Sequence, residues 1–501
     1  MSSTIQIHKL DEATLRIVSE DSGALRELWE HFTFEVEGAR FMPMVRQKLW
    51  DGKVHLLDGR TGTLPYGLLL NALTFLRKLD YKIELDRDII EAAPENKEHL
   101  YEFAKSLDIR SKGETIIPRD YQLEAFAHGI NEGRSLIISP TGSGKSLIIY
   151  MAIRWYLENH DDRVMIVVPT TSLVEQLKKD FADYSSHDSE FDPEHEVHQI
   201  YSGKEKDPGR ARIVITTWQS AVKQPRDWFL QYGMIIGDEA HLFKAKSLNT
   251  IMEQLVNASY RIGTTGTLDG STCNELVLIG NFGPVHRVIS TKELIDNETL
   301  ANLEIKCLLL KHTDELKKAV CKMNYQGEIS TIVEHPGRNR LITNLACDQT
   351  GNTLVLFNLV NKHGKPLYNM IKEKAGDNRH IFYVSGEVAA TDRETIREIT
   401  EGEKDAIIVA SVGTFSTGIN IKNLHNIIFA APTKSQIRVL QSIGRGLRQS
   451  DDGRHTTVYD LADDFSWRKK KNYTLKHALS RIDIYLKESF DYKIFEIPLP
   501  L

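Results

Sequence analysis

Eight consecutive residues, Ser139 to Ser146, read SPTGSGKS and have the composition of a loop that holds nucleotide phosphates. The apolar run SLIISP leads into them, and the helical pattern KSLIIYMAIRWYLEN follows. Between a strand and a helix, backbone N–H groups and the helix N-terminus point toward a bound anion. Gly142 and Gly144 permit a close backbone approach. Lys145 can pair with the β- and γ-phosphates, and Ser146 can ligate Mg²⁺.

The loop departs from the usual phosphate-binding pattern at one position, because that pattern opens with Gly and this chain has Ser139. A glycine-containing turn that binds no nucleotide is the alternative, which the flanking strand and helix disfavour. The nucleotide-binding residues predicted in this loop are Pro140, Thr141, Gly142, Ser143, Gly144, Lys145 and Ser146.

A second stretch, GDEAH, places two adjacent carboxylates at the end of an apolar run. Asp238 can hold Mg²⁺, and Glu239 can orient and deprotonate the attacking water, because phosphoryl transfer mainly requires positioning and charge stabilisation. A lone Asp-Glu pair after a strand is usually a solvated cap, but here it follows a phosphate loop. ATP and Mg²⁺ are therefore the expected cofactors.

Two further stretches complete the predicted nucleotide site. In IIPRDYQLEAF, Tyr121 can stack on adenine and Gln122 can read the edge of the base, although Gln122 as a plain surface residue is the alternative. In QSIGRGLRQ, Gln441, Arg445 and Arg448 share one helical face by i, i+4 and i+3 steps. Arginines on a helix are usually solvated, but these can reach the γ-phosphate as arginine fingers in cis.

The elements that must position these residues repeat a single pattern. Short apolar runs alternate with helical segments from about 113 to 300 and again from about 340, with a mixed segment near 301–340. Continuous β-branched runs between helices indicate buried parallel strands in doubly wound sheets. The predicted strands are SLIISP, VMIVVP, RIVITT and MIIGDE in the first sheet and TLVLFN, HIFYVSG, AIIVAS and NIIFAA in the second.

The two ends of the chain differ from this pattern. Residues 1–112 mix short alternating runs with helical ones and predict a small α/β module. Its expected strands are TIQIHKL, ATLRIVSE and GKVHLLDG, and its expected helices are GALRELWEHFTF and YGLLLNALTFLRKLD. Residues 466–501 are predicted to be helical and basic at their start.

Composition excludes several classes. With 501 residues, 41% hydrophobic and 26% charged, the chain is ordinary globular protein of two to four domains. The net charge of −6 gives no indication that the chain binds nucleic acid, but local basic patches would suffice for such binding. No apolar run is long enough to span a membrane. The four cysteines lack CxxC spacing, so we expect reduced thiols, a cytosolic compartment and no zinc site.

Eight stretches, in this order, resemble the motif series of superfamily 2 helicases: SPTGSGKS, VVPTTSLVEQ, TTWQS, GDEAH, TTGTL, TLVLFN, ASVGTFSTGINI and QSIGRGLRQ. The resemblance implies an α/β fold with two tandem RecA-like, doubly wound parallel-sheet domains, 113–300 and 301–465, after the N-terminal α/β module. It also implies ATP in the cleft between them and nucleic acid across their tops.

Within that superfamily the chain resembles the UvsW-type recombination and fork-remodelling DNA helicases of tailed phages. The stretch FTFEVEGARFMPMVRQKLWDGKVHLLDGRTGTLPYGLL carries this resemblance, and the compact length fits it. It implies an ATP-dependent helicase or translocase for branched DNA, a monomer, in the cytoplasm of an infected host. A large DEAH-class RNA helicase is disfavoured, because the chain lacks room for the C-terminal domains of that class. A nuclease-fused restriction motor is disfavoured, because the N-terminal module lacks a clear metal-carboxylate cluster.

The resemblance also suggests roles for small polar residues, which contact phosphates without reading bases. An ordinary cap is the alternative for each threonine alone. Thr265, Gly266 and Thr267 would couple hydrolysis to domain movement, and Gly418 and Asn420 would lie near nucleotide and strand. The residues expected on the nucleic-acid side are Pro169, Thr170, Thr171, Thr217 and Thr414.

Cations in the N-terminal module suggest a second DNA contact. Arg40, Arg46, Lys48, Lys53 and Arg60 are interleaved with Phe41 and Trp50. Arg46, Lys48 and Lys53 are the predicted DNA-binding set, whereas Trp50 is expected in the core.

WRKKKNY, Trp467 to Tyr473, is either a third DNA contact or a solvated helix start.

An RNA helicase for short duplexes is the alternative enzyme. A junction-binding protein with a vestigial ATPase is the alternative of another class, which the intact Lys145, Glu239 and Arg445 disfavour.

Overall fold

The computed structural model describes residues 4–36, 39–90, 95–140, 142–243, 245–266, 268, 272–297, 303–376, 379–386, 399, 402–414, 424–431, 455–468, 470–488 and 490–499. Contacts divide the chain into two units: Met1–Ser139 with Ser143–Val288, and Pro140–Gly142 with Ile289–Leu501. Of the helices described, none has both the length and the apolar character needed to cross a bilayer.

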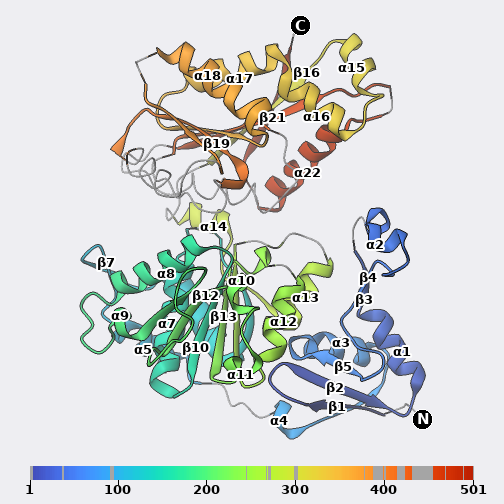
Figure 1. Ribbon diagram of the computed structural model, residues 1–501, viewed down its shortest axis with the longest axis vertical. Coiled ribbons are helices and arrows are strands. Elements are labelled where there is room, and N and C mark those ends of the chain that lie inside the picture. Colours follow the sequence, from blue (N-terminus) through green and yellow to red (C-terminus); the bar gives the residue numbers. More distant parts are fainter. Residues whose placement is uncertain are drawn as a thin grey trace. The chain divides into compact units, whose positions relative to one another are not determined.

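The first unit begins with a four-stranded sheet in the order β5-β2-β1-β6 (Figure 1). Its strands are β1 (Thr4–Lys9), β2 (Thr14–Ser19), β5 (Thr63–Pro65) and β6 (Lys82–Leu85), and its main helices are α1 (Ser22–His31) and α3 (Leu69–Lys78). Alternate residues of β1 and β2, such as Ile5 and Leu15, are buried in a core shared with both helices, as the period of a half-buried strand requires. The small α/β module predicted at the N-terminus is confirmed.

An arm extends from this module. It consists of the antiparallel strands β3 (Thr33–Glu35) and β4 (Lys53–His55), with η1 (Ala39–Phe41) and α2 (Pro43–Arg46) between them (Figure 1). We call these four elements, together with the turn at 47–52, the β3–β4 arm. The expectation that Trp50 packs in the core is wrong: its side chain is only partly buried, and its Nε1 donates to the Lys53 carbonyl at 2.8 Å.

The module packs tightly on helix α13 (Thr272–Phe282) of the domain that contains the phosphate loop, which we call the P-loop domain. A Cβ atom at Gly67 would lie 2.0 Å from the carbonyl oxygen of Ile279, so only glycine lets the two backbones approach this closely. Nearby, the Arg134 guanidinium donates to Glu12 at 2.5 Å and lies 4.1 Å from the Tyr66 ring centroid. The module and the P-loop domain therefore form a single body.

That domain contains a seven-stranded sheet in the order β11-β12-β10-β13-β14-β9-β15, in which all pairings are parallel. The four strands predicted in this part of the chain are confirmed as β9, β10, β12 and β13. The strands are β9 (Arg134–Ile138), β10 (Arg163–Val168), β11 (Val197–Ile200), β12 (Ile213–Thr217), β13 (Tyr232–Asp238), β14 (Tyr260–Thr265) and β15 (Val285–Arg287).

Helices cover both faces of this sheet, as expected of a doubly wound domain. The helices of the first unit that follow α3 are α4 (Arg87–Ile90), α5 (Lys97–Ser106), α6 (Asp120–Glu132), α7 (Lys145–Asn159), α8 (Thr171–Tyr184), α9 (Pro193–Glu196), α10 (Trp218–Ala221), α11 (Arg226–Phe229), α12 (Ala245–Gln254) and α13 (Thr272–Phe282). The short elements η2 (Tyr66–Leu68), η3 (Ala240–Leu242), β7 (Arg110–Ser111) and β8 (Glu114–Thr115) complete it.

The second unit has its own parallel seven-stranded sheet, in the order β18-β19-β17-β20-β21-β16-β22. The strands are β16 (Leu303–Lys311), β17 (Thr353–Phe357), β18 (Ile381–Val384), β19 (Ile407–Ser411), β20 (Asn426–Phe429), β21 (Thr456–Asp464) and β22 (Tyr492–Pro498). The helical prediction for 466–501 is wrong at its end, because β22 is an edge strand paired with β16. The predicted fold class is confirmed by the two tandem sheets.

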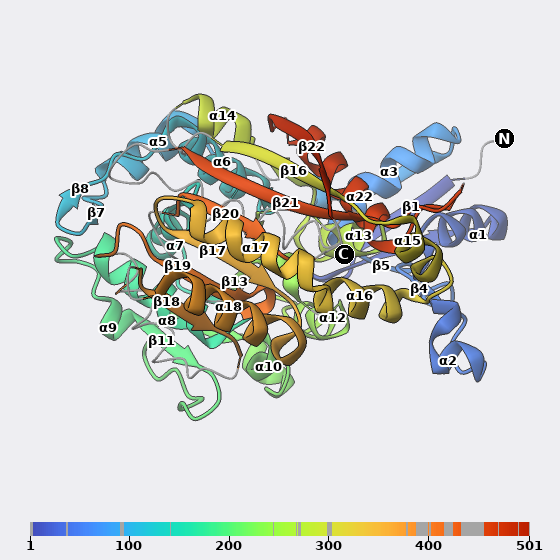
Figure 2. The ribbon, with the colours of Figure 1, turned by 90° about the horizontal axis from the view of Figure 1, so that it is seen from above.

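Figure 2 shows α17 and α18 over one face of the second sheet. The helices in the described part of this unit are α14 (Thr291–Asp296), α15 (Asp314–Val320), α16 (Tyr325–Glu334), α17 (Pro336–Asp348), η4 (Val360–Gly364, a π-helix), α18 (Lys365–Ala375) and α22 (Tyr473–Lys487). Cys307, Cys321 and Cys347 are free thiols, and burial raises the pKa of Cys307 to about 12.

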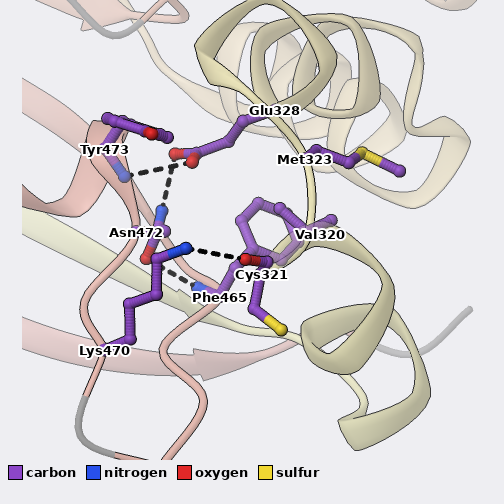
Figure 3. Close-up of a pocket in the computed structure, with 8 residues that line it drawn as sticks. All are labelled: Val320, Cys321, Met323, Glu328, Phe465, Lys470, Asn472 and Tyr473. Carbon is purple, nitrogen blue, oxygen red and sulfur yellow. Dashed lines mark hydrogen bonds between the residues drawn. The ribbon is translucent and has the colours of Figure 1, made fainter.

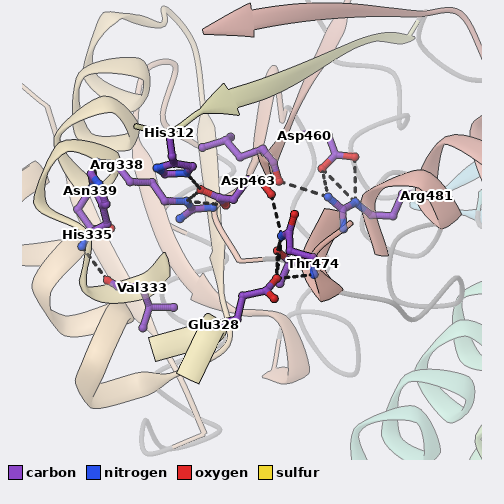
Figure 4. Close-up of polar contacts among 12 residues, drawn as sticks. His312, Glu328, Val333, His335, Arg338, Asn339, Asp460, Asp463, Thr474 and Arg481 are labelled. Carbon is purple, nitrogen blue, oxygen red and sulfur yellow. Dashed lines mark hydrogen bonds and ion pairs between the residues drawn. The ribbon is translucent and has the colours of Figure 1, made fainter. Parts of the chain in front are cut away.

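Charged side chains are buried on both sides of β21 (Figure 4). Asp463 accepts from Arg338 of α17 at 2.9 Å and contacts His312 at 3.0 Å. Asp460 accepts from Arg481 of α22 at 2.6 Å. The two aspartates are three positions apart, so they project to opposite faces of the strand. Asp463 therefore holds α17 on one face, and Asp460 holds α22 on the other.

Candidate nucleotide-binding and catalytic site

The predicted phosphate loop lies between the end of β9 and the start of α7, as the sequence indicated. Gly142 and Gly144 have φ of +88° and +82°, a region that side chains disfavour. A Cβ at Gly144 would lie 2.3 Å from Gln122 Nε2. In the described structure α7 begins without a capping side chain, which suits a helix N-terminus that receives an anion.

Neighbouring side chains fix the shape of this loop. Gln122, only 5% exposed, donates from Nε2 to the Ser143 carbonyl at 2.8 Å and accepts the Arg119 N–H at 2.9 Å. Tyr121 also donates to the Ser143 carbonyl, at 3.0 Å. Gln122 is therefore no plain surface residue, and in this conformation its amide supports the loop. Adenine recognition by Tyr121 and Gln122 stays a prediction.

Lys145 and the two carboxylates of GDEAH come together at the ends of β9 and β13. Lys145 Nζ donates to the Ser139 carbonyl at 3.2 Å and lies 3.8 Å from Glu239 Oε1. Asp238 is buried and accepts from Thr264 Oγ1 at 2.7 Å. Burial and the neighbouring Glu239 carboxylate raise the pKa of Asp238 above its ordinary value, and Lys145 opposes this shift.

Glu239 follows the end of β13 in the left-handed region, with φ of +50°, which is uncommon outside glycine. Its Oε2 lies 3.5 Å from His241 Nδ1, and that nitrogen lies 2.5 Å from Thr265 Oγ1. The sequence alone assigns no role to His241. His241 is the last residue of the GDEAH stretch, so its place in that motif could have indicated a role. In the structure it links Glu239 to Thr265, which belongs to the stretch expected to couple hydrolysis to domain movement.

The predicted magnesium ligands are compatible with a hard cation. Magnesium usually takes one or two carboxylates, waters and phosphate oxygens rather than an all-protein cage. Asp238 supplies a buried carboxylate, and Ser146 Oγ, although bonded to Tyr184 Oη at 2.8 Å, keeps acceptor capacity. The described residues contain no cluster of three or more His, Cys, Asp or Glu suited to a metal.

The predicted nucleic-acid residues of the first unit lie at the same carboxyl edge of the sheet, but on other strands. Pro169, Thr170 and Thr171 follow β10, and Thr217 ends β12. In the sheet order, β10 and β12 lie on one side of β13, whereas β14 and β9 lie on the other. The sheet thus separates the expected strand-contacting residues from the phosphate loop.

Several predicted residues belong to other parts of the chain. Thr414 lies at the carboxyl end of β19, and its Oγ1 accepts from Ser411 at 2.7 Å. Arg46, Lys48 and Lys53 lie on the β3–β4 arm. The predicted residues that lie outside the described part of the chain are Thr141, Thr267, Gly418, Asn420, Gln441, Arg445 and Arg448.

Three protein-family profiles match the chain in succession. The profile described as DNA helicase UvsW, N-terminal, matches residues 4–86. Type III restriction enzyme, res subunit, matches 115–270, and Helicase conserved C-terminal domain matches 337–450. The last range contains Gln441, Arg445 and Arg448.

The chain is 36% identical over 504 residues to the ATP-dependent DNA helicase uvsW of Enterobacteria phage T4, which covers 97% of this chain and 98% of that protein. The crystal structure of T4 UvsW matches with a TM-score of 0.54 and 35% identity over 99% of this chain and 100% of that one. A fragment of a putative HsdR subunit of a type I restriction enzyme from Vibrio vulnificus shares the fold, with a TM-score of 0.56 and 16% identity over 79% of this chain and 71% of that one. The chain belongs to the UvsW family of superfamily 2 DNA helicases.

Proposed function

We propose that the chain is an ATP-dependent DNA helicase or translocase that remodels branched DNA: forks, four-way junctions and displacement loops, in recombination, repair and replication. Family membership supports the ATPase and the DNA substrate, because the phage T4 relative is named an ATP-dependent DNA helicase. The observation that carries the branched-DNA part is the basic, exposed β3–β4 arm, which is fixed to the P-loop domain.

The arm carries four cations that form no ion pair among the described residues, although Glu35 is the cross-strand partner of Lys53. Arg40, Arg46 and Lys48 are exposed and Lys53 is half-buried. Within the described residues, none of the four has a carboxylate oxygen within 4 Å, so their charges remain available to phosphates. Phosphate neutralisation by such side chains supplies most sequence-independent affinity for DNA.

The arm also exposes large apolar side chains. Phe41, Met44 and Leu49 are 62%, 56% and 71% exposed. The Arg40 guanidinium lies 4.7 Å from the Phe41 ring centroid, so cation and aromatic face are presented together. Apolar side chains that contact bases while cations hold the backbone are typical of proteins that bind deformed or open DNA. This combination favours a branch point over a uniform duplex.

The nucleotide chemistry of the proposal uses the residues at the ends of β9 and β13. Lys145 would pair with the β- and γ-phosphates, and Asp238 and Ser146 would hold Mg²⁺, which would supply charge stabilisation at the phosphates. Glu239 orients the attacking water and accepts its proton. Arg445 and Arg448 are proposed as the arginine fingers.

The test is junction binding by a variant in which Arg46, Lys48 and Lys53 are all replaced by Ala. We expect weaker binding to a four-way junction, with a smaller loss for single strands. The slope of log affinity against log salt should fall by about 0.9 for each lost phosphate contact, or about 2.7 for three. The measurement is a junction titration at several salt concentrations.

The matched control replaces three exposed cations elsewhere in the module, Arg16, Arg77 and Lys78, by Ala. It removes the same charge and should keep the parental slope. Deletion of the module is a poorer test, because it would uncover Val277 and Ile279 of α13, which the module buries. Equal slopes and equal junction preference in the parent and the arm variant would make the arm a structural brace.

Two alternatives are separated by ATP hydrolysis measured with branched DNA, single-stranded DNA and RNA. An RNA helicase would respond most strongly to RNA. A junction-binding protein with a vestigial ATPase would bind junctions and hydrolyse no ATP with any of them. We expect branched DNA to stimulate hydrolysis most.

The domain organisation and setting belong to the same proposal. We propose division into 1–112, 113–300, 301–465 and 466–501, with the first segment as a DNA-binding module. The chain is proposed to act as a monomer in the cytoplasm of an infected host cell. Light scattering with and without junction DNA tests the monomer.

A further inference from the structure

The second unit carries an open groove of about 720 Å³. It lies where the chain leaves β21, at the carboxyl edge of the sheet, which is also the edge on which Thr414 lies. We call it the α22 groove, after the helix that follows. The residues that line it are Cys321, Trp467, Arg468, Lys470, Lys471 and Lys476.

The loop that forms the groove is held in one shape. Trp467 and Lys470 exchange backbone hydrogen bonds of 3.1 Å each, which places Arg468 in a tight turn with φ of +54°. At the base of the loop, Asn472 accepts the Phe465 N–H at 3.0 Å and donates to the Asp463 carbonyl at 3.0 Å. Such a conformation persists only where the surrounding contacts enforce it.

A buried carboxylate from another helix anchors the same loop (Figure 3). Glu328 of α16 accepts from the side chain of Asn472 at 2.8 Å, from the Tyr473 N–H at 3.0 Å and from the Thr474 N–H at 2.7 Å. It therefore caps α22 at the end where a negative charge is favourable. Lys470 Nζ adds a bond to the Cys321 carbonyl at 2.9 Å.

The charge of the groove is positive and not neutralised by the protein. Arg468, Lys470, Lys471 and Lys476 are all exposed. Across the described part of the chain, none of the four has a carboxylate oxygen within 4 Å. Four cations along one groove match the charge of a phosphate backbone.

Aromatic side chains lie beside these cations. Tyr473 and Tyr325 are 41% and 37% exposed, with ring centroids 6.0 Å apart and an interplanar angle of 80°. Trp467, which lines the groove, is half-buried, and the ammonium group of Lys318 lies 4.8 Å from its ring centroid. Exposed aromatic faces among cations are stacking platforms for unpaired bases, which a closed duplex does not offer.

We propose that the α22 groove binds single-stranded nucleic acid, with its cations on the phosphates and Tyr473, Tyr325 and Trp467 against the bases. This inference rests on the proposed function, since it adds a strand-holding surface to a DNA motor. It concerns a surface distinct from the β3–β4 arm and from the threonines at the carboxyl edge of the first sheet.

The test compares the equilibrium binding of full-length variants to a fluorescent oligothymidylate in the absence of ATP. The groove variant is Arg468→Gln, Lys471→Gln and Lys476→Gln. We expect its Kd to rise at least tenfold and the log–log salt slope to fall by about 2, at roughly 0.7 for each single-strand contact. The control, Lys365→Gln, Lys372→Gln and Lys404→Gln, removes equal charge from α18 and from the opposite edge of the sheet and should bind like the parent.

A second variant separates stacking from charge. Tyr473→Ser should weaken binding about tenfold and leave the salt slope unchanged, because it removes a stacking surface and no cation. Glu328→Gln should weaken binding as well, since it loosens the loop without altering the groove's own cations. Circular dichroism and urea unfolding confirm that each variant is folded.

Unchanged affinity and slope in the folded groove variant would overturn the proposal. So would displacement of the oligothymidylate by a poly-glutamate peptide at lower concentration than by unlabelled oligothymidylate, which would assign the groove to an acidic protein segment. These results are distinct from failure of the proposed function, which would appear as no DNA-stimulated ATP hydrolysis by the parent.

Discussion

The nucleotide site of the first unit and the buried charges around β21 in the second use the same residue types in opposite ways. Lys145 keeps a partly exposed side chain, a carbonyl contact at 3.2 Å and a carboxylate 3.8 Å away. Arg481 is fully buried, and its guanidinium donates to Asp460 at 2.6, 2.9 and 3.0 Å (Figure 4).

The difference separates charges available to a substrate from charges used by the fold. A buried charge must be paired, because an unpaired one costs several kcal/mol. The cation at the phosphate loop is held loosely enough to exchange its present contacts for phosphates. The state of pairing, rather than the presence of an Arg or Lys, therefore indicates which charges are functional.

The largest effect is expected at Lys145. Lys145→Ala should abolish ATP hydrolysis and leave DNA binding and the urea midpoint close to those of the parent, since its contacts within the protein are few. Phosphate release and junction binding measure the two properties. Turnover near the parental rate would contradict the phosphate-loop assignment.

Arg445→Lys tests whether a predicted finger behaves like Lys145 or like Arg481. The substitution keeps the charge and loses the planar fork that spans phosphoryl oxygens. We expect kcat to fall by roughly 10³–10⁵-fold with the fold intact. A loss below about tenfold would shift the finger role to Arg448.

Glu239→Gln keeps the shape of the side chain and removes the base. ATP should still bind, while hydrolysis slows by about 10²–10⁴-fold, the usual contribution of a general base. The variant should accumulate on DNA in the presence of ATP. Binding of a fluorescent ATP analogue and single-turnover hydrolysis separate the two steps, and loss of binding would refute the assigned role.

Arg481→Met should show the reverse profile. It leaves Asp460 buried without its guanidinium partner, which destabilises a protein by about 3–5 kcal/mol. Urea unfolding measures the loss, and turnover per folded molecule should stay parental. The double variant with Asp460→Asn should recover much of the stability. A destabilisation below about 1 kcal/mol would show that the pair does little for the fold.

The smallest effect concerns acid stability. His363 is buried, both ring nitrogens lack a hydrogen-bond partner among the described residues, and burial lowers its pKa to about 3. Because the unfolded histidine titrates near 6.5, the unfolded chain takes up a proton first and stability falls as the pH drops below 6.5. The loss should reach about 2 kcal/mol at pH 5.

His363→Phe removes this titrating group. Its urea midpoint should vary less between pH 7 and 5 than that of the parent. Parallel pH profiles in the two proteins would show that His363 is not responsible for the loss.

Much of the fold was predictable because its signals are local. The eight apolar runs assigned as parallel strands are all strands, and the phosphate loop lies between a strand and a helix as the pattern required. Lys145 and Glu239 come within 3.8 Å because parallel strands end at one edge of a sheet. β22 was missed although KIFEI has strand composition, because the preceding helical pattern was extended too far.

Other features depend on contacts that no local pattern carries. Arg338 and Asp463 lie 125 positions apart, and each alone looks like a solvated charge. Tyr184 reaches Ser146 from the end of α8, with no signal in its neighbourhood. The hydrogen bond from the Gln122 amide to the Ser143 carbonyl is likewise not visible in the sequence, while the reading of adenine by Gln122 stays a prediction. Partners of this kind are decided by packing.

The contact at Gly67 has a mechanical consequence. With carbonyl oxygens of α13 where a side chain would begin, the N-terminal module and the P-loop domain form one lever with no joint. A branch point gripped by the β3–β4 arm would stay at a constant distance from the bound nucleotide throughout a cycle. A torque on the bound duplex would be transmitted directly to the P-loop domain. Gly67→Ala would test whether work is still transmitted once this contact is forced apart.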